Sequence, residues 1–445
     1  METRQRKLAL ALMVFFFGVF GVYILLRAQG WIIDSKNLKL VKTGGIFLKF
    51  HPDNAKITIN GIPKKTSASL IDSGTIIKNL IPKEYLVTVS KPGFKNWEKN
   101  FEVQPGLVNS ASQIKLLKEN LTESAIFDFK IEDFWLTKNG LVYKTPDGKI
   151  RLGNDILRGE SLVSNDLSSN KLITEKNGTY FLINLDTPSS VLNINEIFNG
   201  LKNRQLHLPG KVSIKFISPH PFSHEKIIIA SVNSLYLLDP QKVDLEMIAA
   251  LKNPEFFAVS GDNVIIFQKN GELKFINLIL KKSNSYLISL PSIINQFMAS
   301  KDNKVFFLLN DQNELVFYNR NENKLLEIGK NIKEFTLQED DKRIAMISTN
   351  DKLSVFYLDN YEGDIKREKG EILNIDLQKN KLSNFEWLEG TNYFSVLTDH
   401  DLLIGEIDDR KPLNQYVVKT GVSKYFYDKK IYALLETGEL INLVF

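Results

Sequence analysis

The residues that could carry chemistry are few, and two histidines in Ser218–Lys226, "SPHPFSHEK", come first. His220 and His224 are four residues apart, a spacing that on a helix would place two imidazoles on one face and could begin a metal site. Pro219 and Pro221 disfavour a regular helix here, because proline lacks a backbone N–H and clashes with the preceding turn. We therefore predict no metal site.

A histidine and an acid also meet in "HPDNAKITING" (His51–Gly61). A catalytic Asp53 would need a base or a second carboxylate, and neither is spaced to serve it. Turn chemistry explains the same residues, because proline fixes φ, aspartate accepts backbone N–H groups and Asn54 tolerates a positive φ. We predict a corner that feeds a strand ending at Asn60, with His51 on the surface.

No pattern for covalent or cofactor chemistry occurs elsewhere. The sequence has no Gly-x-Ser-x-Gly elbow and no glycine-rich phosphate loop, and it contains no cysteine. A serine-hydrolase elbow, thiolate nucleophiles, iron–sulfur clusters and cysteine zinc sites are thereby excluded. We predict no catalytic, cofactor-binding or metal-binding residues, no cofactor, and a protein that is not an enzyme.

The composition indicates a β-rich globular protein of more than one domain. The chain has 445 residues, of which 43% are hydrophobic and 11% aromatic, including 29 Phe and 14 Tyr. This length exceeds what one core usually serves, and bulky aromatic residues favour sheets. The net charge is only +5 and is evenly spread, so we expect no nucleic-acid partner.

The N-terminal segment can cross a membrane. Leu8–Leu26, "LALALMVFFFGVFGVYILL", is free of charge and as a helix would span ~28 Å, about one hydrocarbon core. Arg27 ends the run, no small-x-small cleavage site follows, and Trp31 is placed as an interfacial anchor. We predict a cytoplasmic tail (1–7), an uncleaved transmembrane helix (8–26) and a linker (27–43), with the bulk of the chain extracytoplasmic at the cell membrane.

Residues 44–117 read as a small antiparallel β-sandwich. Short alternating runs predict strands at 46–50, 56–60, 74–80, 85–90, 97–103 and 112–117. "PDNA" (Pro52–Ala55) and "EYLVTVSKPGFKNWEKNFEVQPG" (Glu84–Gly106) resemble the PEGA domains, although Lys83 replaces a usual glycine. That resemblance implies a non-catalytic β-domain of bacterial and archaeal envelope or surface proteins.

From residue 121 to residue 445 a hairpin recurs eight times. The copies are Leu141–Leu152, Leu172–Leu185, Ile227–Leu238, Val264–Leu278, Val305–Tyr318, Ile344–Leu358, Tyr393–Ile407 and Ile431–Phe445. Several spacings lie near the ~40 residues of a four-stranded propeller blade. "TPDGK" (Thr145–Lys149), "SKDNK" (Ser300–Lys304) and "QEDDKR" (Gln338–Arg343) resemble degraded turns of WD40-like or TolB-type β-propellers. We predict eight blades, or seven if one hairpin is an edge; two stacked sandwiches are the alternative.

Closure of such a ring needs a strand from outside the last hairpin, since Phe445 ends the chain directly after it. The alternating stretch Ser124–Ile131, "SAIFDFKI", precedes the first hairpin and is the candidate. We predict that it pairs with Leu440–Phe445 and covers that edge, because unpaired strand edges promote aggregation.

Function is then expected to be binding. Two insertions, Asp186–Lys211 and Asp359–Lys381, exceed ordinary turn length, and recognition commonly lies in long loops on a rigid scaffold. We predict a membrane-anchored, non-catalytic envelope protein whose propeller binds an envelope protein or a surface polysaccharide as a scaffold. The alternative is an extracytoplasmic propeller hydrolase or lyase acting on cell-wall or surface glycans. A sensor is disfavoured, because seven residues leave no room for an output domain.

Overall fold

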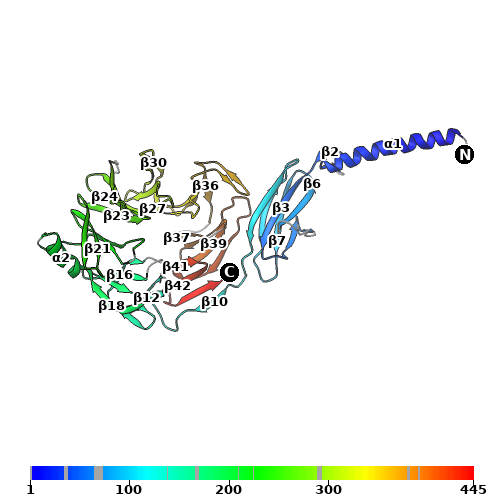
Figure 1. The fold of residues 1–445 in the computed structure, drawn as a ribbon. Coiled ribbons are helices and arrows are strands. Elements are labelled where there is room, and N and C mark those ends of the chain that lie inside the picture. Colours follow the sequence, from blue (N-terminus) through cyan, green and yellow to red (C-terminus); the bar gives the residue numbers. More distant parts are fainter. Residues whose placement is uncertain are drawn as a thin grey trace.

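The computed structural model describes residues 3–34, 39–64, 74–137, 139–165, 170–208, 210–223, 225–287, 293–377, 381–388 and 391–444. A long N-terminal helix leads into a small β unit, which lies against one side of a ring of sheets (Figure 1). The helix, α1 (Thr3–Ala28), begins inside the predicted tail, and its stretch Leu8–Ala28 is long and apolar enough to cross a bilayer. Its apolar side chains are exposed, which agrees with the prediction of a segment that does not belong to a soluble core.

The predicted linker (27–43) is folded. It contains a hairpin of β1 (Trp31–Asp34) and β2 (Lys39–Lys42), in which Ile33 is opposite Leu40. Backbone pairing and a side-chain bond from Thr43 fix this segment to the sheets that follow. The sequence did not predict this hairpin, because four-residue strands of mixed polarity give little alternation to detect.

Two sheets follow and enclose one core. The first contains β6 (Gly74–Leu80), β3 (Gly44–His51) and β9 (Val108–Lys115) in that order, and the second contains β5 (Ile62–Lys64), β4 (Lys56–Ile59), β7 (Glu84–Ser90) and β8 (Trp97–Glu102). Their inward residues, among them Ile46, Val87 and Phe101, form a single buried cluster. The predicted strands are present, but β5 was missed and β3 runs parallel to β9, so the unit is not purely antiparallel.

The remainder of the described chain forms eight four-stranded antiparallel sheets, named A to H in chain order. Sheet A contains β11 (Asp133–Thr137), β12 (Gly140–Lys144), β13 (Ile150–Leu152) and β14 (Asp155–Leu157), and sheet B contains β15 (Ser161–Asn165), β16 (Lys171–Lys176), β17 (Thr179–Asn184) and β18 (Thr187–Asn193). Sheet C contains β19 (Phe216–Pro219), β20 (Ile227–Ala230), β21 (Ser234–Asp239) and β22 (Asp244–Ala250), and sheet D contains β23 (Pro254–Ser260), β24 (Asn263–Gln268), β25 (Glu272–Asn277) and β26 (Ser283–Leu287). In each sheet the middle two strands are one of the predicted hairpins.

Sheets E to H continue the same order. Sheet E contains β27 (Ile294–Ala299), β28 (Val305–Asn310), β29 (Leu315–Asn319) and β30 (Lys324–Gly329), and sheet F contains β31 (Ile332–Leu337), β32 (Arg343–Ser348), β33 (Leu353–Tyr357) and β36 (Ile372–Ile375). Sheet G contains β37 (Leu382–Trp387), β38 (Tyr393–Thr398), β39 (Asp401–Glu406) and β40 (Gln415–Lys419), and sheet H contains β41 (Val422–Asp428), β42 (Lys430–Leu435), β43 (Leu440–Val444) and β10 (Thr122–Ala125). Sheet F also carries a small hairpin of β34 (Tyr361–Glu362) and β35 (Lys366–Arg367), and helix α2 (Ile194–Gln205) lies between sheets B and C.

Each sheet shares a hydrophobic cluster with the sheets before and after it, which makes the arrangement a ring. Leu172 packs with residues of sheets A and B, and Phe275 with residues of D and E. The circle is completed by Ile131 and Phe134, which pack against Leu440 of sheet H. The ring is a β-propeller with its first strands toward the centre, where they contact one another in succession.

The closing strand is β10. Ser124 pairs with Asn442 and Ala125 with Ile441, and the Ile131 N–H donates to the Gly438 carbonyl over 2.8 Å. The predicted closure is therefore confirmed, with a shorter strand that starts two residues earlier. The Ile126 N–H still donates to the Leu440 carbonyl over 2.9 Å, and beyond it Phe127 packs on Tyr143 at 4.5 Å.

A buried ionic cluster joins the N-terminal unit to sheet G. Lys99 of β8 is fully buried, and its ammonium donates to the carbonyls of Asp408 and Arg410 over 3.1 and 2.9 Å. It also lies 3.4 Å from the Glu406 carboxylate, which accepts a bond of 3.1 Å from the Trp97 indole N–H. Burial raises the pKa of Glu406, and the Lys99 charge opposes that rise. The unit and the propeller are thus held by charges that neither could bury alone.

One edge strand of each N-terminal sheet, β8 and β9, faces the same joint. The Asn100 N–H donates to the Lys411 carbonyl over 2.7 Å, and the Ser112 N–H donates to the Asp364 carboxylate over 2.6 Å. The Arg410 guanidinium lies 4.6 Å from the Phe101 ring and donates to a carbonyl of β9. The propeller therefore contacts the edges at β8 and β9, which would otherwise expose more unpaired backbone groups.

Deleting residues 443–445 is expected to lower the stability of the whole propeller. The deletion removes the partners of Thr122 and Glu123 and the buried Leu443 side chain, at a cost of roughly 2–5 kcal/mol. Because every sheet shares its core with two others, calorimetry should show one cooperative transition at a lower temperature. Val444→Thr, at an exposed position, is the control; fraying confined to β43 in hydrogen exchange would contradict closure.

Candidate functional site

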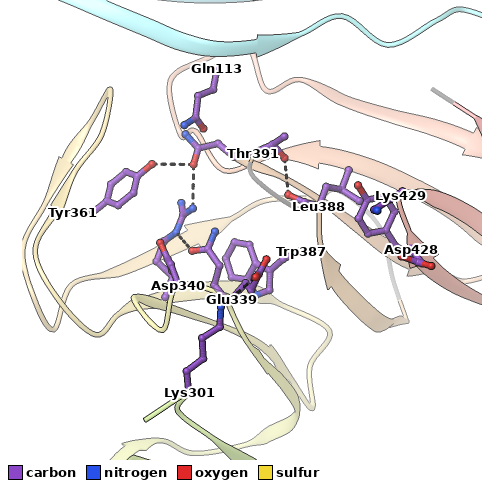
Figure 2. Close-up of a pocket in the computed structure, with 14 residues that line it drawn as sticks. Gln113, Lys301, Glu339, Asp340, Tyr361, Trp387, Leu388, Thr391, Asp428 and Lys429 are labelled. Carbon is purple, nitrogen blue, oxygen red and sulfur yellow. Dashed lines mark hydrogen bonds and ion pairs between the residues drawn. The ribbon is translucent and has the colours of Figure 1, made fainter. Parts of the chain in front are cut away.

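A polar pocket of about 580 Å³ opens where sheets E, F, G and H and the N-terminal unit meet (Figure 2). The turns after the first strands of sheets E, F, G and H supply most of its wall, and β9 adds Gln113. Its lining residues are Gln113, Lys301, Gln338, Glu339, Asp340, Arg343, Tyr361, Trp387, Leu388, Thr391, Asn392, Tyr427, Asp428 and Lys429. The volume lies within the range of small-ligand pockets, ~300–1,000 Å³.

The turn of sheet E shows how the sequence builds this wall. The Ser300 hydroxyl donates to Asp302 over 2.7 Å, and the same carboxylate accepts the Lys304 N–H over 3.0 Å. Asn303 takes a φ of 54°, which asparagine tolerates better than most residues. Hydrogen bonds from Lys304 and Ser300 hold the pKa of Asp302 at about 2. The turn is therefore fixed by its own side chains and presents Lys301 outward.

The turn of sheet F repeats this design and is tied to the first. Asp340 accepts the Lys342 N–H over 3.0 Å, and Asp341 takes a φ of 58°. Asp341 also accepts the Lys301 backbone N–H over 2.7 Å, and the Lys301 ammonium lies 3.2 Å from Glu339. Bonds between neighbouring turns keep this side of the pocket in one shape.

Arg343 forms the floor. It is 2% exposed, and its Nε and Nη2 atoms donate to the Gln338 and Asn392 side-chain oxygens over 2.6 and 3.1 Å. Its guanidinium carbon lies 4.6 Å from the Tyr361 ring centre and 5.2 Å from that of Trp387. The Tyr361 hydroxyl donates to the same Asn392 oxygen over 2.9 Å (Figure 2). The cation thus orders two aromatic rings and two amides.

The chemistry of the lining is balanced. Three basic residues, Lys301, Arg343 and Lys429, face three acidic ones, Glu339, Asp340 and Asp428. Such a pocket offers hydrogen-bond donors and acceptors in similar number and has no strong preference for either sign of charge. Tyr361, Trp387 and Tyr427 add aromatic surface. The arrangement suits an uncharged, many-hydroxyl ligand with apolar faces.

The first strands that support these turns are connected around the centre by side chains. Gln296 of β27 bonds to the backbone of Phe335 in both directions, with lengths of 2.8 and 3.2 Å. Glu334 of β31 accepts the Phe385 N–H over 3.0 Å, and Glu386 of β37 accepts the Tyr427 N–H over 2.7 Å. Backbone groups left unpaired at these edge strands are thereby satisfied by the neighbouring sheet.

Of the side chains that connect the first strands, that of Glu386 has a strongly shifted pKa. Burial, together with repulsion from Glu334, raises its pKa to about 7, against the lowering effect of the bond from Tyr427. Its acceptor role connects sheet G to the turn that carries Asp428 and Lys429. Ionisation of this carboxyl near neutrality therefore acts on a strand that supports the pocket.

The corner predicted in His51–Gly61 is present, and the chain around His220 also forms a turn. The His220 Nδ1 accepts the N–H groups of Phe222 and Ser223 over 3.2 and 3.0 Å, so it closes a turn. His224 lies outside the described residues. His51 is exposed at the corner, where Asn54 has a φ of 66° as expected. Among the described residues no group of three histidine or acidic side chains is placed to hold a metal.

The two long insertions differ in what they contribute. Asp186–Lys211 contains β18 and α2, whose Phe198 and Leu201 join the core between sheets B and C. This insertion therefore contains a packed helix, whose apolar residues recur at helical spacing and point inward. The described part of Asp359–Lys381 supplies Tyr361 to the pocket.

Most pocket residues were missed from the sequence, although one signal was present. "SKDNK" and "QEDDKR" occupy equivalent turns in sheets E and F, whereas "TPDGK" follows the second strand of sheet A. Aligning the first two would have placed Lys301 beside Glu339 and Asp340. The contributions of Trp387 and Gln113 had no comparable signal, because they depend on how the ring meets the N-terminal unit.

Comparisons with known proteins agree with the ring topology. The family model described as the NUP159/214 beta propeller matches residues 241–432. No curated protein matches the sequence. The family match and the cyclic sheet order together identify the region as a β-propeller.

Solved structures similar to this chain include BamB from Moraxella catarrhalis, with a TM-score of 0.46, 12% identity, and coverage of 73% of this chain and 98% of that one. The β-propeller domain of Myceliophteria thermophila Cps50 (Swd1) matches with a TM-score of 0.40 and 13% identity, and the match covers 63% of this chain and 96% of that one. The computationally designed Ika8 protein matches with a TM-score of 0.46 and 14% identity, and the match covers 72% of this chain and 97% of that one.

Glu386→Gln is expected to stabilise the protein at pH 8 and to flatten its pH dependence. A carboxyl whose pKa is raised by folding favours the folded state below its ordinary pKa of 4.5, and this contribution is lost as pH rises through about 7. The loss is on the order of a few kcal/mol. Glutamine keeps the oxygen that accepts from Tyr427. Unfolding free energies from urea titrations between pH 5 and 8 measure the effect.

Glu327→Gln, at an exposed carboxylate of sheet E, is the matched control. If the wild-type and Glu386→Gln proteins lose stability in parallel across this pH range, the Glu386 carboxyl is not buried as described.

Proposed function

We propose that this chain is a membrane-anchored, non-catalytic envelope protein whose β-propeller binds an uncharged surface polysaccharide in the pocket between sheets E to H. In this proposal α1 is a single-pass anchor with its N-terminus in the cytoplasm, and the sheets are extracytoplasmic. An envelope protein as ligand is the other predicted partner.

The observation that carries the proposal is the balanced polar pocket with aromatic side chains. A sugar ring has hydroxyl groups that both donate and accept hydrogen bonds, and its C–H faces pack on aromatic rings. Three basic and three acidic side chains, three aromatic rings and the amides of Gln113 and Asn392 offer matching groups. A strongly acidic or basic partner would instead favour a wall of one sign.

The architecture supports presentation of this site from a membrane. We further propose that the eight sheets are eight blades and that residues 44–117 are a PEGA-like β-sandwich. Gln113 of that unit lines the pocket, so ligand would contact both the anchored unit and the propeller. A rigid scaffold limits the conformational entropy lost on binding.

Isothermal titration calorimetry with neutral and uronate-containing oligosaccharides tests the proposal on the full chain in detergent micelles. Neutral glycans should bind more tightly than acidic ones. Asp428→Asn and Gln113→Ala, both at exposed pocket positions, should each weaken binding by about tenfold, the value of one lost hydrogen bond of ~1.4 kcal/mol.

Asp311→Asn, in an exposed turn outside the pocket, is the control and should bind like the wild type. Binding unaffected by both pocket variants would contradict the assigned site. Turnover of the oligosaccharides, followed by mass spectrometry, would favour the predicted hydrolase or lyase instead.

A further inference from the structure

The end of α1 is fixed directly to the N-terminal sheets. The Gly30 N–H donates to the Arg27 carbonyl over 3.1 Å, and the Gly30 carbonyl accepts both the backbone N–H and the hydroxyl of Thr43, over 2.8 and 2.7 Å. Thr43 is buried. The two ends of the β1–β2 hairpin are therefore joined to each other at Gly30, two residues beyond the end of α1.

The turn between β8 and β9 is attached at the same point. The Gly106 N–H donates to the Thr43 carbonyl, and the Gly45 N–H donates to the Leu107 carbonyl, each over 2.9 Å. A Cβ atom on Gly44 would collide with the Gln104 carbonyl, so only glycine permits this approach. A short series of hydrogen bonds, through Thr43 and Gly30, thus connects the turn that carries Leu107 to the end of α1.

Apolar side chains gather at this end of the unit and have no cover in the described chain. Ile33 is 62% exposed and its cross-strand partner Leu40 is 47% exposed, while Leu107 and Val108 are each 53% exposed. Lys39 and Lys42 are the first and last residues of β2, on either side of Leu40 and Val41, and are also exposed. An apolar surface flanked by lysines is the composition of segments that lie at a membrane interface.

We propose that Ile33, Leu40 and Leu107 form a juxtamembrane surface that inserts into the boundary between lipid headgroups and acyl chains. The proposal rests on the proposed role of α1 as a membrane anchor. With two residues between the helix and the hairpin, the position of α1 sets the position of this surface. Trp31, at the start of β1, lies at the depth where indole rings are favoured.

This surface gives the membrane a second point of attachment. A single helix alone would let the protein tilt and rotate, whereas inserted side chains near the helix end restrict both motions. Because the unit is joined to sheet G through Lys99, the restriction extends to the propeller and its pocket.

Site-specific fluorescence quenching in lipid nanodiscs tests the proposal. The chain contains no cysteine, so a single substitution carries a unique label. Labels at Ile33→Cys, Leu40→Cys and Leu107→Cys should be quenched at least about twofold more by lipids with a nitroxide near the headgroup than a label at Lys324→Cys on sheet E, and less by aqueous iodide.

Val19→Cys, inside α1, separates the possible failures. If lipids with a deep nitroxide quench this label while the three surface labels behave like Lys324→Cys, the juxtamembrane surface is wrong and the anchor stands. If the Val19→Cys label is not quenched by lipid, the anchor itself is wrong. Protection of the three labels from both lipid and iodide would mean that another protein surface covers them, which also overturns the proposal.

Discussion

The arrangement of this protein depends on one buried ammonium group. Lys99 leaves the N-terminal unit and enters a loop of sheet G, where two carbonyls and the Glu406 carboxylate receive it without access to water. Removing one partner of such a pair costs about 3–5 kcal/mol, because the other charge stays buried and uncompensated. The joint is therefore specific: the two parts can meet in this orientation or must leave charges unpaired.

This constraint has consequences in both directions along the chain. Toward the N-terminus, Thr43 fixes the end of α1 to the same sheets that carry Lys99, so the helix and the joint belong to one body. Toward the C-terminus, the joint places Gln113 at the mouth of the pocket formed by the turns of sheets E to H. The pocket thus has a wall from the part of the chain nearest to α1.

The sequence predicted the repeated part of the fold because local patterns determine it. Most of the hairpins have two apolar strands around a turn with a residue at positive φ, as Asn177 shows with a φ of 50°. The closing segment was also predictable, since β41, β42 and β43 supply three strands and the four-stranded pattern of the other sheets requires a fourth. The pocket was not, because the strands before its turns end at residues 299, 337, 387 and 428, and the turns meet only after the ring closes.

The sequence of β8 contains one sign of the contact between the N-terminal unit and sheet G. In "WEKNFEV", Lys99 has the same parity as Trp97, Phe101 and Val103, so it points to the same buried face of β8. A lysine in phase with aromatic core residues indicates either an error of register or a charge with a buried partner. Its partners Glu406 and Asp408 are about three hundred residues away, which no strand pattern can reveal.

The most direct test of this account is the distance between the two bodies. Spin labels at the exposed positions Lys56→Cys of β4 and Lys324→Cys of β30, measured by double electron–electron resonance, should give one narrow distribution in the full chain. Lys99→Met keeps the volume of the side chain but removes its charge, and it should broaden that distribution while each body stays folded. A broad distribution in the native protein, or an unchanged narrow one in Lys99→Met, would contradict the claim that this ammonium sets the orientation.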